Sequence, residues 1–277
     1  MRPNVLYFTI VFSGSALTTA ATFWVAHRND WLVYPRSDRW NRAPVAKFGG
    51  VSILLTFLVA VIVFGASWPL RKLGLLTVAM GLIGLVDDIF ELRPSWKFLS
   101  QFVVAAVAAW SGIVYSLFHN SVLNYLLTLL WILGITNALN LLDNMDGLAA
   151  GVSVITASAL VFVGHGASPM ATGLIAMAAS LLGFLVFNFH PAKIFIGDTG
   201  SLGVGFFLAC CAAPQAGHRD SLFPILCVPV LVLFLPAFDM LLVSITRTLK
   251  GRAISAGAKD HTSHRLVMLG LASGTQF

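Results

Sequence analysis

Two adjacent carboxylates end one of the apolar stretches of this chain, and a third acid follows one helical turn later. The residues are Asp87, Asp88 and Glu91. Neighbouring carboxylates raise each other's pKa unless a cation lies close to them. On a helix, this spacing turns at least two of the three acids towards one point. The pattern predicts either a Mg²⁺ site or a base that takes a proton from a phosphate or hydroxyl group. The alternative is a solvated acidic helix end.

A second group of polar residues recurs at a spacing of three: Asn137, Asn140, Asp143 and Asp146. This spacing keeps neighbouring side chains close on a helix surface, and oxygen-bearing side chains suit a hard cation. The alternative is a polar helix end and turn, with Gly147 in the left-handed conformation that ends a helix. A polar helix end alone would not require four such residues, so the run favours a functional site.

A third acid, Asp198, stands between two glycines just before an apolar run. Gly197 and Gly200 allow the backbone to approach a ligand closely. We expect Ser201 to cap the following helix, whose first amides would face an anion. An ordinary turn would explain Gly200 and Ser201 but not the acid.

A fourth group lies near the end of the chain and comprises His261, His264 and Arg265. Arginine binds phosphate in a bidentate manner, so this group predicts a phosphate-binding surface. A zinc site is the alternative, but it would need a further ligand and no cysteine is close. Two single residues are weaker candidates. His190 is either a loop residue or a ligand, and Asp239 is an intramembrane acid that is either functional or satisfied within a helix interface.

Composition identifies the elements that must position these groups. The chain has 277 residues, of which 58% are hydrophobic and 10% charged, whereas a soluble domain has about 25% charged residues. Continuous rather than alternating apolar runs predict an all-α, polytopic bundle of about nine membrane helices in one integral-membrane domain, residues 1–277. The cysteines lie in apolar runs and are expected to pack. The expected spans are 4–26, 49–66, 70–86, 98–117, 121–139, 148–164, 170–187, 201–213 and 222–245.

The basic residues predict the orientation of these spans. If the nine spans alternate, thirteen of the 17 lysines and arginines fall on one side of the membrane. Cytoplasmic loops carry this excess, and the four acidic groups fall on the same side. We therefore expect a multi-pass membrane protein with a site that faces the cytoplasm. The net charge of +6 suits an anionic substrate and does not by itself indicate nucleic acid.

Together the four groups resemble those of the polyprenyl-phosphate N-acetylhexosamine-1-phosphate transferases. This family includes the phospho-MurNAc-pentapeptide translocase and the UDP-GlcNAc:undecaprenyl-phosphate GlcNAc-1-phosphate transferases. The resemblance runs from residues 38–50 (DRWNRAPVAKFGG) to Arg265 and keeps the family's order. Its segments are DDxxE with Lys97 after it, NALNLLDNMDGLAAG, FNFHPAKIFIGDTGSL and the His-rich loop.

The resemblance implies transfer of a HexNAc-1-phosphate from a UDP-activated amino sugar to undecaprenyl or another polyprenyl phosphate, with release of UMP. It implies Mg²⁺ as the cofactor, with Mn²⁺ as an alternative, a homodimer, and a place in the bacterial inner membrane. The roles that it assigns fall into three classes. The catalytic residues would be Asp87, Asp88 and Asp143, and the metal ligands Asn140 and Asp198. The residues that would contact lipid phosphate, donor or diphosphate are Lys47, Lys97, Asp146, Asn188, His261, His264 and Arg265.

Three departures separate the chain from many relatives. Asn41 stands where many carry histidine, and Glu91 where they often have aspartate. The sequence stops at Phe277, where relatives usually continue through one or two more helices, so we expect a short member or a truncated one. The form of residues 38–40 favours initiation of a bacterial O-antigen or other polysaccharide over peptidoglycan synthesis.

Two other readings stay open from the sequence. Acids at membrane edges also line the ion paths of cation-coupled transporters, which place them near the middle of the membrane on broken helices. The acids of this chain gather at one face instead. The second alternative is a catalytically inactive relative with a structural or regulatory role, which the early end of the sequence leaves open.

Overall fold

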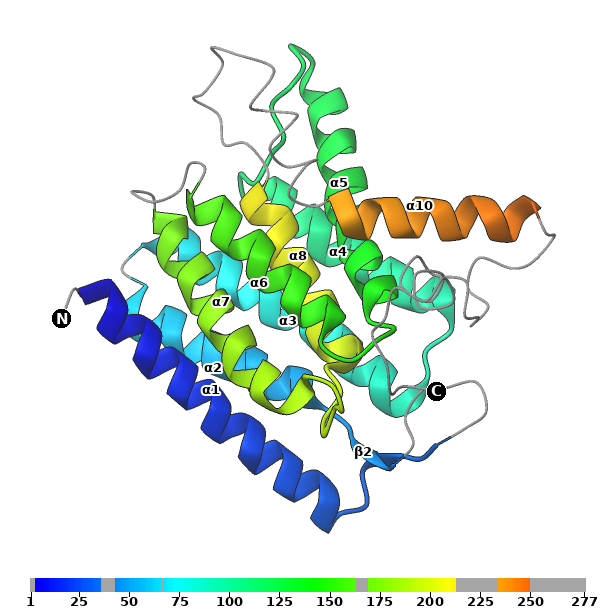
Figure 1. The fold of residues 1–277 in the computed structure, drawn as a ribbon. Helices are drawn as coiled ribbons and strands as arrows, with labels where there is room; N and C mark the ends of the chain where they lie inside the picture. Colours follow the sequence, from blue (N-terminus) through cyan, green and yellow to red (C-terminus); the bar gives the residue numbers. More distant parts are fainter. Residues whose placement is uncertain (1–2, 36–42, 66, 163–168, 213–233, 250–277) are drawn as a thin grey trace.

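The computed structural model describes residues 3–35, 43–65, 67–162, 169–212 and 234–249. Nine helices and one two-stranded ribbon make up these residues (Figure 1). The strands β1 and β2 are Leu32–Val33 and Val45–Ala46. The helices are α1 Pro3–Arg28, α2 Gly49–Phe64, α3 Trp68–Phe90, α4 Pro94–Trp110, α5 Ser121–Leu142, α6 Leu148–Leu160, α7 Pro169–Asn188, α8 Gly197–Ala212 and α10 Phe234–Leu249.

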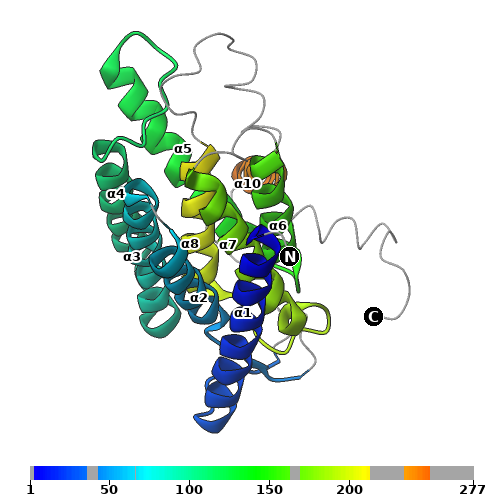
Figure 2. The same ribbon diagram turned by 90° about the vertical axis from the view of Figure 1, so that its left-hand side faces the viewer.

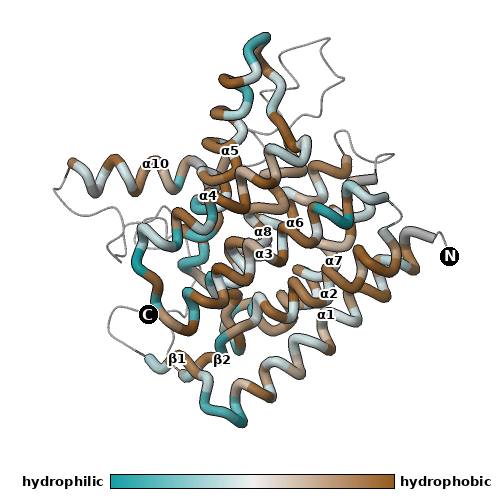
Figure 3. The backbone as a smooth tube through the Cα atoms, turned by 180° about the vertical axis from the view of Figure 1, so that it is seen from behind, coloured by the Kyte–Doolittle hydropathy of each residue, from teal (hydrophilic) through white to brown (hydrophobic). Residues whose placement is uncertain are grey.

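The helices of the bundle have the length and apolar surface of membrane-spanning helices. Four helices, α1, α3, α5 and α7, are long and apolar enough to cross one, and α2, α6 and α8 are apolar but shorter. Large apolar side chains cover the outer surface, where Leu17, Trp110 and Leu130 are 71%, 84% and 72% exposed. Apolar segments appear along most of the outward-facing helices (Figure 3). The arrangement confirms the all-α polytopic class.

Helix α8 forms the centre of the bundle. All of its residues from Thr199 to Ala212 are buried, and it contacts α2, α3, α5 and α6. Two perpendicular views show it running between its neighbours (Figures 1 and 2). Small residues allow this close packing. A side chain at Gly84 of α3 would overlap the main-chain carbonyl of Asp198, and one at Gly50 of α2 would overlap the main chain of Gly200.

Two connections at one end of the bundle are joined by main-chain hydrogen bonds. Strands β1 and β2 pair antiparallel, and Ala46 of β2 also bridges in parallel to Ile194. Four hydrogen bonds of 2.9–3.0 Å join residues 46–50 to residues 193–196. The α1–α2 connection is thereby attached to the segment that leads into α8.

Several helix ends differ from the sequence-based expectation. The helix expected at 98–117 is α4, Pro94–Trp110. Proline is tolerated in the first turn of a helix, and Gly112, with a φ of 103°, lets the chain turn away after the last turn. The helix expected at 201–213 begins four residues earlier, at Gly197. Of the expected span 222–245, the structure describes only the part from residue 234.

Replacement of Gly84 tests the close contact between α3 and α8. We expect Gly84→Ala to lower the stability of the protein by about 1–3 kcal/mol, because the added methyl group forces the two backbones apart. Gly134 of α5 is the matched control, since a methyl group there meets nothing within 4 Å; Gly134→Ala should be neutral or stabilising. Thermal unfolding in detergent measures both, and equal midpoints for Gly84→Ala and wild type would refute the contact.

Candidate active site

Lys97 joins two acids that come from different helices. Its ammonium group lies 2.9 Å from Oδ2 of Asp87 and also forms an ion pair with Oδ2 of Asp198. Asp87 belongs to the last turn of α3, Lys97 to the first turn of α4 and Asp198 to the first turn of α8. The three side chains are 16–29% exposed, so solvent screens the pairs only in part. The structure thus brings together three predicted site residues.

The two adjacent acids of α3 have different partners. Oδ1 of Asp87 accepts a hydrogen bond from the main-chain N–H of Leu92 at 2.8 Å, which ties this acid to the turn after α3. Glu91 forms the end of α3 with a φ of 49° and is exposed. The point at which two acids meet is therefore made by Asp87 and Asp198, and not by the DDxxE group alone.

Asp88 caps the N-terminus of α8. Its Oδ1 accepts a hydrogen bond from the N–H of Asp198 at 3.0 Å, and its Oδ2 accepts bonds from the N–H and the hydroxyl of Thr199 at 2.9 and 2.7 Å. The first amides of a helix have no partner within it, and a carboxylate suits its positive end. The expected cap, Ser201, lies one turn inside α8 and donates to the carbonyl of Gly197. That expectation was wrong because the helix begins earlier.

Asn140 reaches Asp198 from α5. Its Nδ2 donates to Oδ1 of Asp198 at 3.0 Å and to Oγ of Ser201 at 2.9 Å. The two residues expected to bind the metal are therefore neighbours, although they are far apart in the sequence. Asn137 points elsewhere and bonds to Gln101 of α4 at 2.7 Å.

Asp143 follows the last residue of α5 and is half-buried. Burial raises the pKa of its carboxyl group well above the ordinary value, and the negative charges of Asp198, Asp88 and Asp146 raise it further. The carboxylates of Asp88, Asp146 and Asp198 are therefore close enough to Asp143 to interact with it electrostatically. Close carboxylates of this kind favour a bound cation.

Asp146 and Asn188 join the α5–α6 turn to the connection after α7. Oδ2 of Asp146 lies 2.9 Å from Nδ1 of His190 and accepts a bond from the N–H of Ala192 at 3.0 Å. Asn188 is buried and bonds through both side-chain polar atoms to main chain, accepting from Gly147 at 3.1 Å and donating to Ile194 at 2.9 Å. Its contacts position the loop; direct contact with a substrate stays a prediction.

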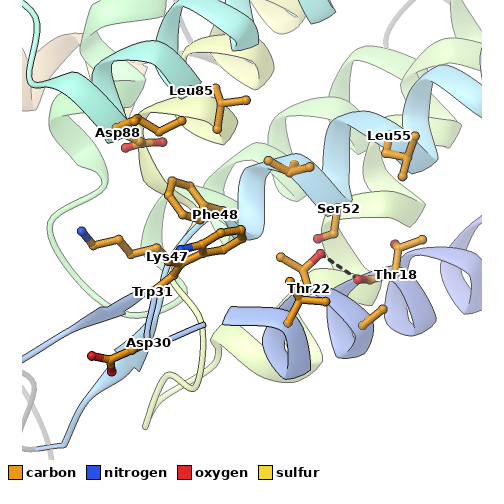
Figure 4. Close-up of a pocket in the computed structure, with 14 residues that line it drawn as sticks. Thr18, Thr22, Asp30, Trp31, Lys47, Phe48, Ser52, Leu55, Leu85 and Asp88 are labelled. Atoms are coloured by element: carbon orange, nitrogen blue, oxygen red, sulfur yellow. Dashed lines mark hydrogen bonds between the residues drawn. The ribbon is translucent and has the colours of Figure 1, made fainter. Parts of the chain in front are cut away.

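The remaining predicted residues lie apart from this cluster or outside the described residues. Gly147 is left-handed, with a φ of 71°, but it directly precedes α6 and does not end α5. Lys47, between β2 and α2, lines a groove (Figure 4). Asp239 is buried in α10, a helix that packs against α5. His261, His264, Arg265 and Asn41 lie outside the described residues. The Asp146–His190 pair was missed, because no spacing in the sequence relates the two loops.

Comparison with known proteins finds a family match over the part of the chain that carries most of these site residues. Residues 70–214 match the glycosyl transferase family 4, and this span contains most of α3, all of α4 and α5, and the first turn of α8. A probable undecaprenyl-phosphate N-acetylglucosaminyl 1-phosphate transferase of Bacillus subtilis is 37% identical over 251 residues, which cover 86% of this chain and 70% of the relative.

Two further relatives carry related names. A decaprenyl-phosphate N-acetylglucosaminephosphotransferase of Mycobacterium tuberculosis is 33% identical over 290 residues, 89% of this chain and 71% of the relative. A phospho-N-acetylmuramoyl-pentapeptide-transferase of Staphylococcus carnosus is 34% identical over 57% of each chain. The protein is thus a helical membrane transferase. It belongs to the glycosyl transferase family 4.

Removal of Asp88 tests its role as the cap of α8. We expect Asp88→Ala to lower the free energy of unfolding by about 1–3 kcal/mol, because two main-chain amides and a hydroxyl group lose their acceptor. Glu91→Ala removes a nearby exposed acid and should change stability by less than about 0.5 kcal/mol. Thermal unfolding in detergent distinguishes the two, and an Asp88→Ala variant as stable as Glu91→Ala would contradict the capping role.

Proposed function

We propose that this protein transfers a HexNAc-1-phosphate from a UDP-activated amino sugar to a polyprenyl phosphate such as undecaprenyl phosphate. The observation that carries the proposal is the meeting of Asp87, Lys97, Asn140 and Asp198 at the ends of four helices. The names of the relatives support the same reaction. A transporter would need acids near the middle of its spans, whereas these acids lie at helix ends.

The residues present fit Mg²⁺. A carboxylate of Asp198 and the amide group of Asn140 lie side by side, and both can supply oxygen ligands. Within the described part of the chain, no three His, Cys, Asp or Glu side chains gather as a preformed metal site. This agrees with the habit of Mg²⁺, which takes one or two protein carboxylates and completes its shell with water and substrate phosphates. When bound, the ion would offset the negative charge of the diphosphate.

The remaining residues suit an in-line displacement. An oxygen of the lipid phosphate attacks the phosphorus that bears the sugar, the bond from that phosphorus to the bridging oxygen breaks, and UMP leaves with the electron pair. The Lys97 ammonium would hold the lipid phosphate, and Asp87 and Asp88 would orient it or accept its proton. Asp143 and Asp146 would contact the donor from the α5–α6 turn. A direct displacement needs no covalent intermediate on an aspartate.

The cellular setting is part of the proposal. If the predicted spans alternate, thirteen of the 17 lysines and arginines fall on the side of the acidic site, which favours a cytoplasmic site in the bacterial inner membrane. A soluble UDP-sugar would reach the site from this side and the lipid from the bilayer. The product would initiate O-antigen or another cell-surface polysaccharide.

The metal ligands can be tested by turnover. We expect the wild-type protein to release UMP from at least one of a panel of UDP-sugars when polyprenyl phosphate and Mg²⁺ are present, and to stop when EDTA removes the metal. Asp198→Asn should reduce the rate by at least about 100-fold, the size of effect seen when one strong transition-state contact is lost. Glu91→Gln should keep near-normal activity. Undiminished turnover by Asp198→Asn would remove this residue from the site.

The role of Lys97 predicts a difference between the two substrates. We expect Lys97→Ala to raise the KM for the lipid phosphate more than the KM for the UDP-sugar, because the lost ammonium group pairs with the acceptor phosphate. Steady-state kinetics with each substrate varied in turn would measure the difference. Equal increases for both substrates would contradict the assignment.

A further inference from the structure

Gln101 is a polar residue on the buried side of α4, a helix that the structure describes in full. The other buried residues of this helix are three alanines, and Gln101 itself is 0% exposed. Its Oε1 accepts a hydrogen bond from Nδ2 of Asn137 on α5 at 2.7 Å. Desolvation of an amide among apolar helices is costly, so a glutamine on a face that is otherwise alanine requires an explanation.

Gln101 and Asn137 each lie one helical turn from a residue of the candidate site. Lys97 precedes Gln101 by four positions on α4. Asn140 follows Asn137 by three positions on α5, and residues at these spacings share one face of a helix. Lys97 pairs with Oδ2 of Asp198, while Asn140 donates to Oδ1 of the same carboxylate. The Gln101–Asn137 bond therefore joins the two helices that hold Asp198, one turn away from it.

Helix α4 packs against α3 and α5 and lies at the edge of the bundle, with α8 further inside (Figure 2). The side chain of Lys97 thus reaches from an outer helix to the central one, and its position depends on how α4 packs against its neighbours. Among the described residues, the Gln101–Asn137 bond is the one side-chain hydrogen bond between α4 and α5. A hydrogen bond has a preferred length and direction, so it fixes the register of two membrane helices more strictly than apolar packing does.

Stability alone does not explain this hydrogen bond. Nδ2 of Asn137 also donates to the carbonyl of Leu133 within α5 at 2.9 Å, so Asn137 has a partner without Gln101. Nε2 of Gln101 is buried and, within the described part of the chain, has no partner. An unpaired buried N–H lowers stability, and an apolar side chain of similar shape would avoid that cost. The alignment of α4 with α5 therefore explains the glutamine better than stabilisation of the fold does.

We propose that Gln101 is a positioning residue for the transfer reaction. Its bond to Asn137 fixes α4 against α5, and this keeps the ammonium group of Lys97 at one oxygen of Asp198 while Asn140 binds the other. Without the bond, the start of α4 shifts relative to α8 and Lys97 moves away from the acids. The inference rests on the proposed function, in which Lys97 holds the acceptor phosphate.

Gln101→Leu tests this role, because leucine is apolar, similar in shape and unable to accept the bond. We expect the KM for undecaprenyl phosphate to rise about tenfold or more and the KM for the UDP-sugar to change less than about twofold. The thermal midpoint in detergent should stay at or above that of the wild type. Phe102→Leu is the matched control, since Phe102 is the next residue of α4 and is 41% exposed; it should leave all three quantities unchanged.

A double variant separates positioning from packing. In a Lys97→Ala background, Gln101→Leu should raise the KM for the lipid phosphate by less than about twofold, because the group that Gln101 positions is already absent. A residue that acts only through packing would add its full effect in both backgrounds. Full additivity of the two substitutions therefore overturns the proposal.

Acylation of lysines reports the position of Lys97 without turnover. An N-hydroxysuccinimide ester reacts with free amines, and peptide mass spectrometry of the full chain gives the rate at each lysine. We expect Gln101→Leu to speed the labelling of Lys97 about tenfold, because its amine is released from the ion pair with Asp198. The rate at Lys193, which is already exposed, should not change.

Each outcome decides between positioning and a packing role. Wild-type KM values together with wild-type labelling of Lys97 would reduce Gln101 to a packing residue. Faster labelling of every lysine, or a lower thermal midpoint with equal losses for both substrates, would show general loosening and also overturn the proposal. If the wild-type protein released no UMP from any UDP-sugar, the proposed function would fail, whereas selective labelling of Lys97 in Gln101→Leu would still show that Gln101 positions it.

Discussion

The cap that Asp88 provides for α8 is the interaction on which the site depends. Helix α8 is buried from Thr199 onwards, and the free amides of its first turn need a partner. The acid at the end of α3 supplies that partner, and the small residue at Gly84 lets the two backbones come close enough. The negative end of one helix and the positive end of another thus stabilise each other. Asp198 is presented at this junction as a consequence.

Around the start of α8, several acidic side chains lie near a single lysine, Lys97. Lys97 pairs with Asp87 and Asp198, while Asp143 feels the charges of three other acids. A protein interior tolerates such an excess only at a cost, and sites of this kind commonly serve a function. A diphosphate with a divalent ion would complement it. This charge pattern is the observation that the proposed transfer reaction depends on.

The sequence predicts the class of the fold well, because long apolar runs leave few alternatives to membrane helices. It also predicts the gathering of acids at one end of the bundle. It does not predict which groups bond to one another. The contact between Asp88 and Thr199, and that between Asp146 and His190, join residues that are distant in the sequence, and spacing rules apply only within one helix. For the same reason the start of α8 was misplaced and Ser201 was assigned as its cap.

The hydrogen bonds between residues 46–50 and 193–196 limit which substitutions these two loops can accept. They make one rigid body of two loops, one of which carries Lys47 while the other leads to Asp198. A substitution that shifts one loop displaces the other, so cation and acid keep their separation only if both loops change in concert. Substitutions that leave the spacing of Lys47 and Asp198 unchanged are therefore expected mainly outside these two loops.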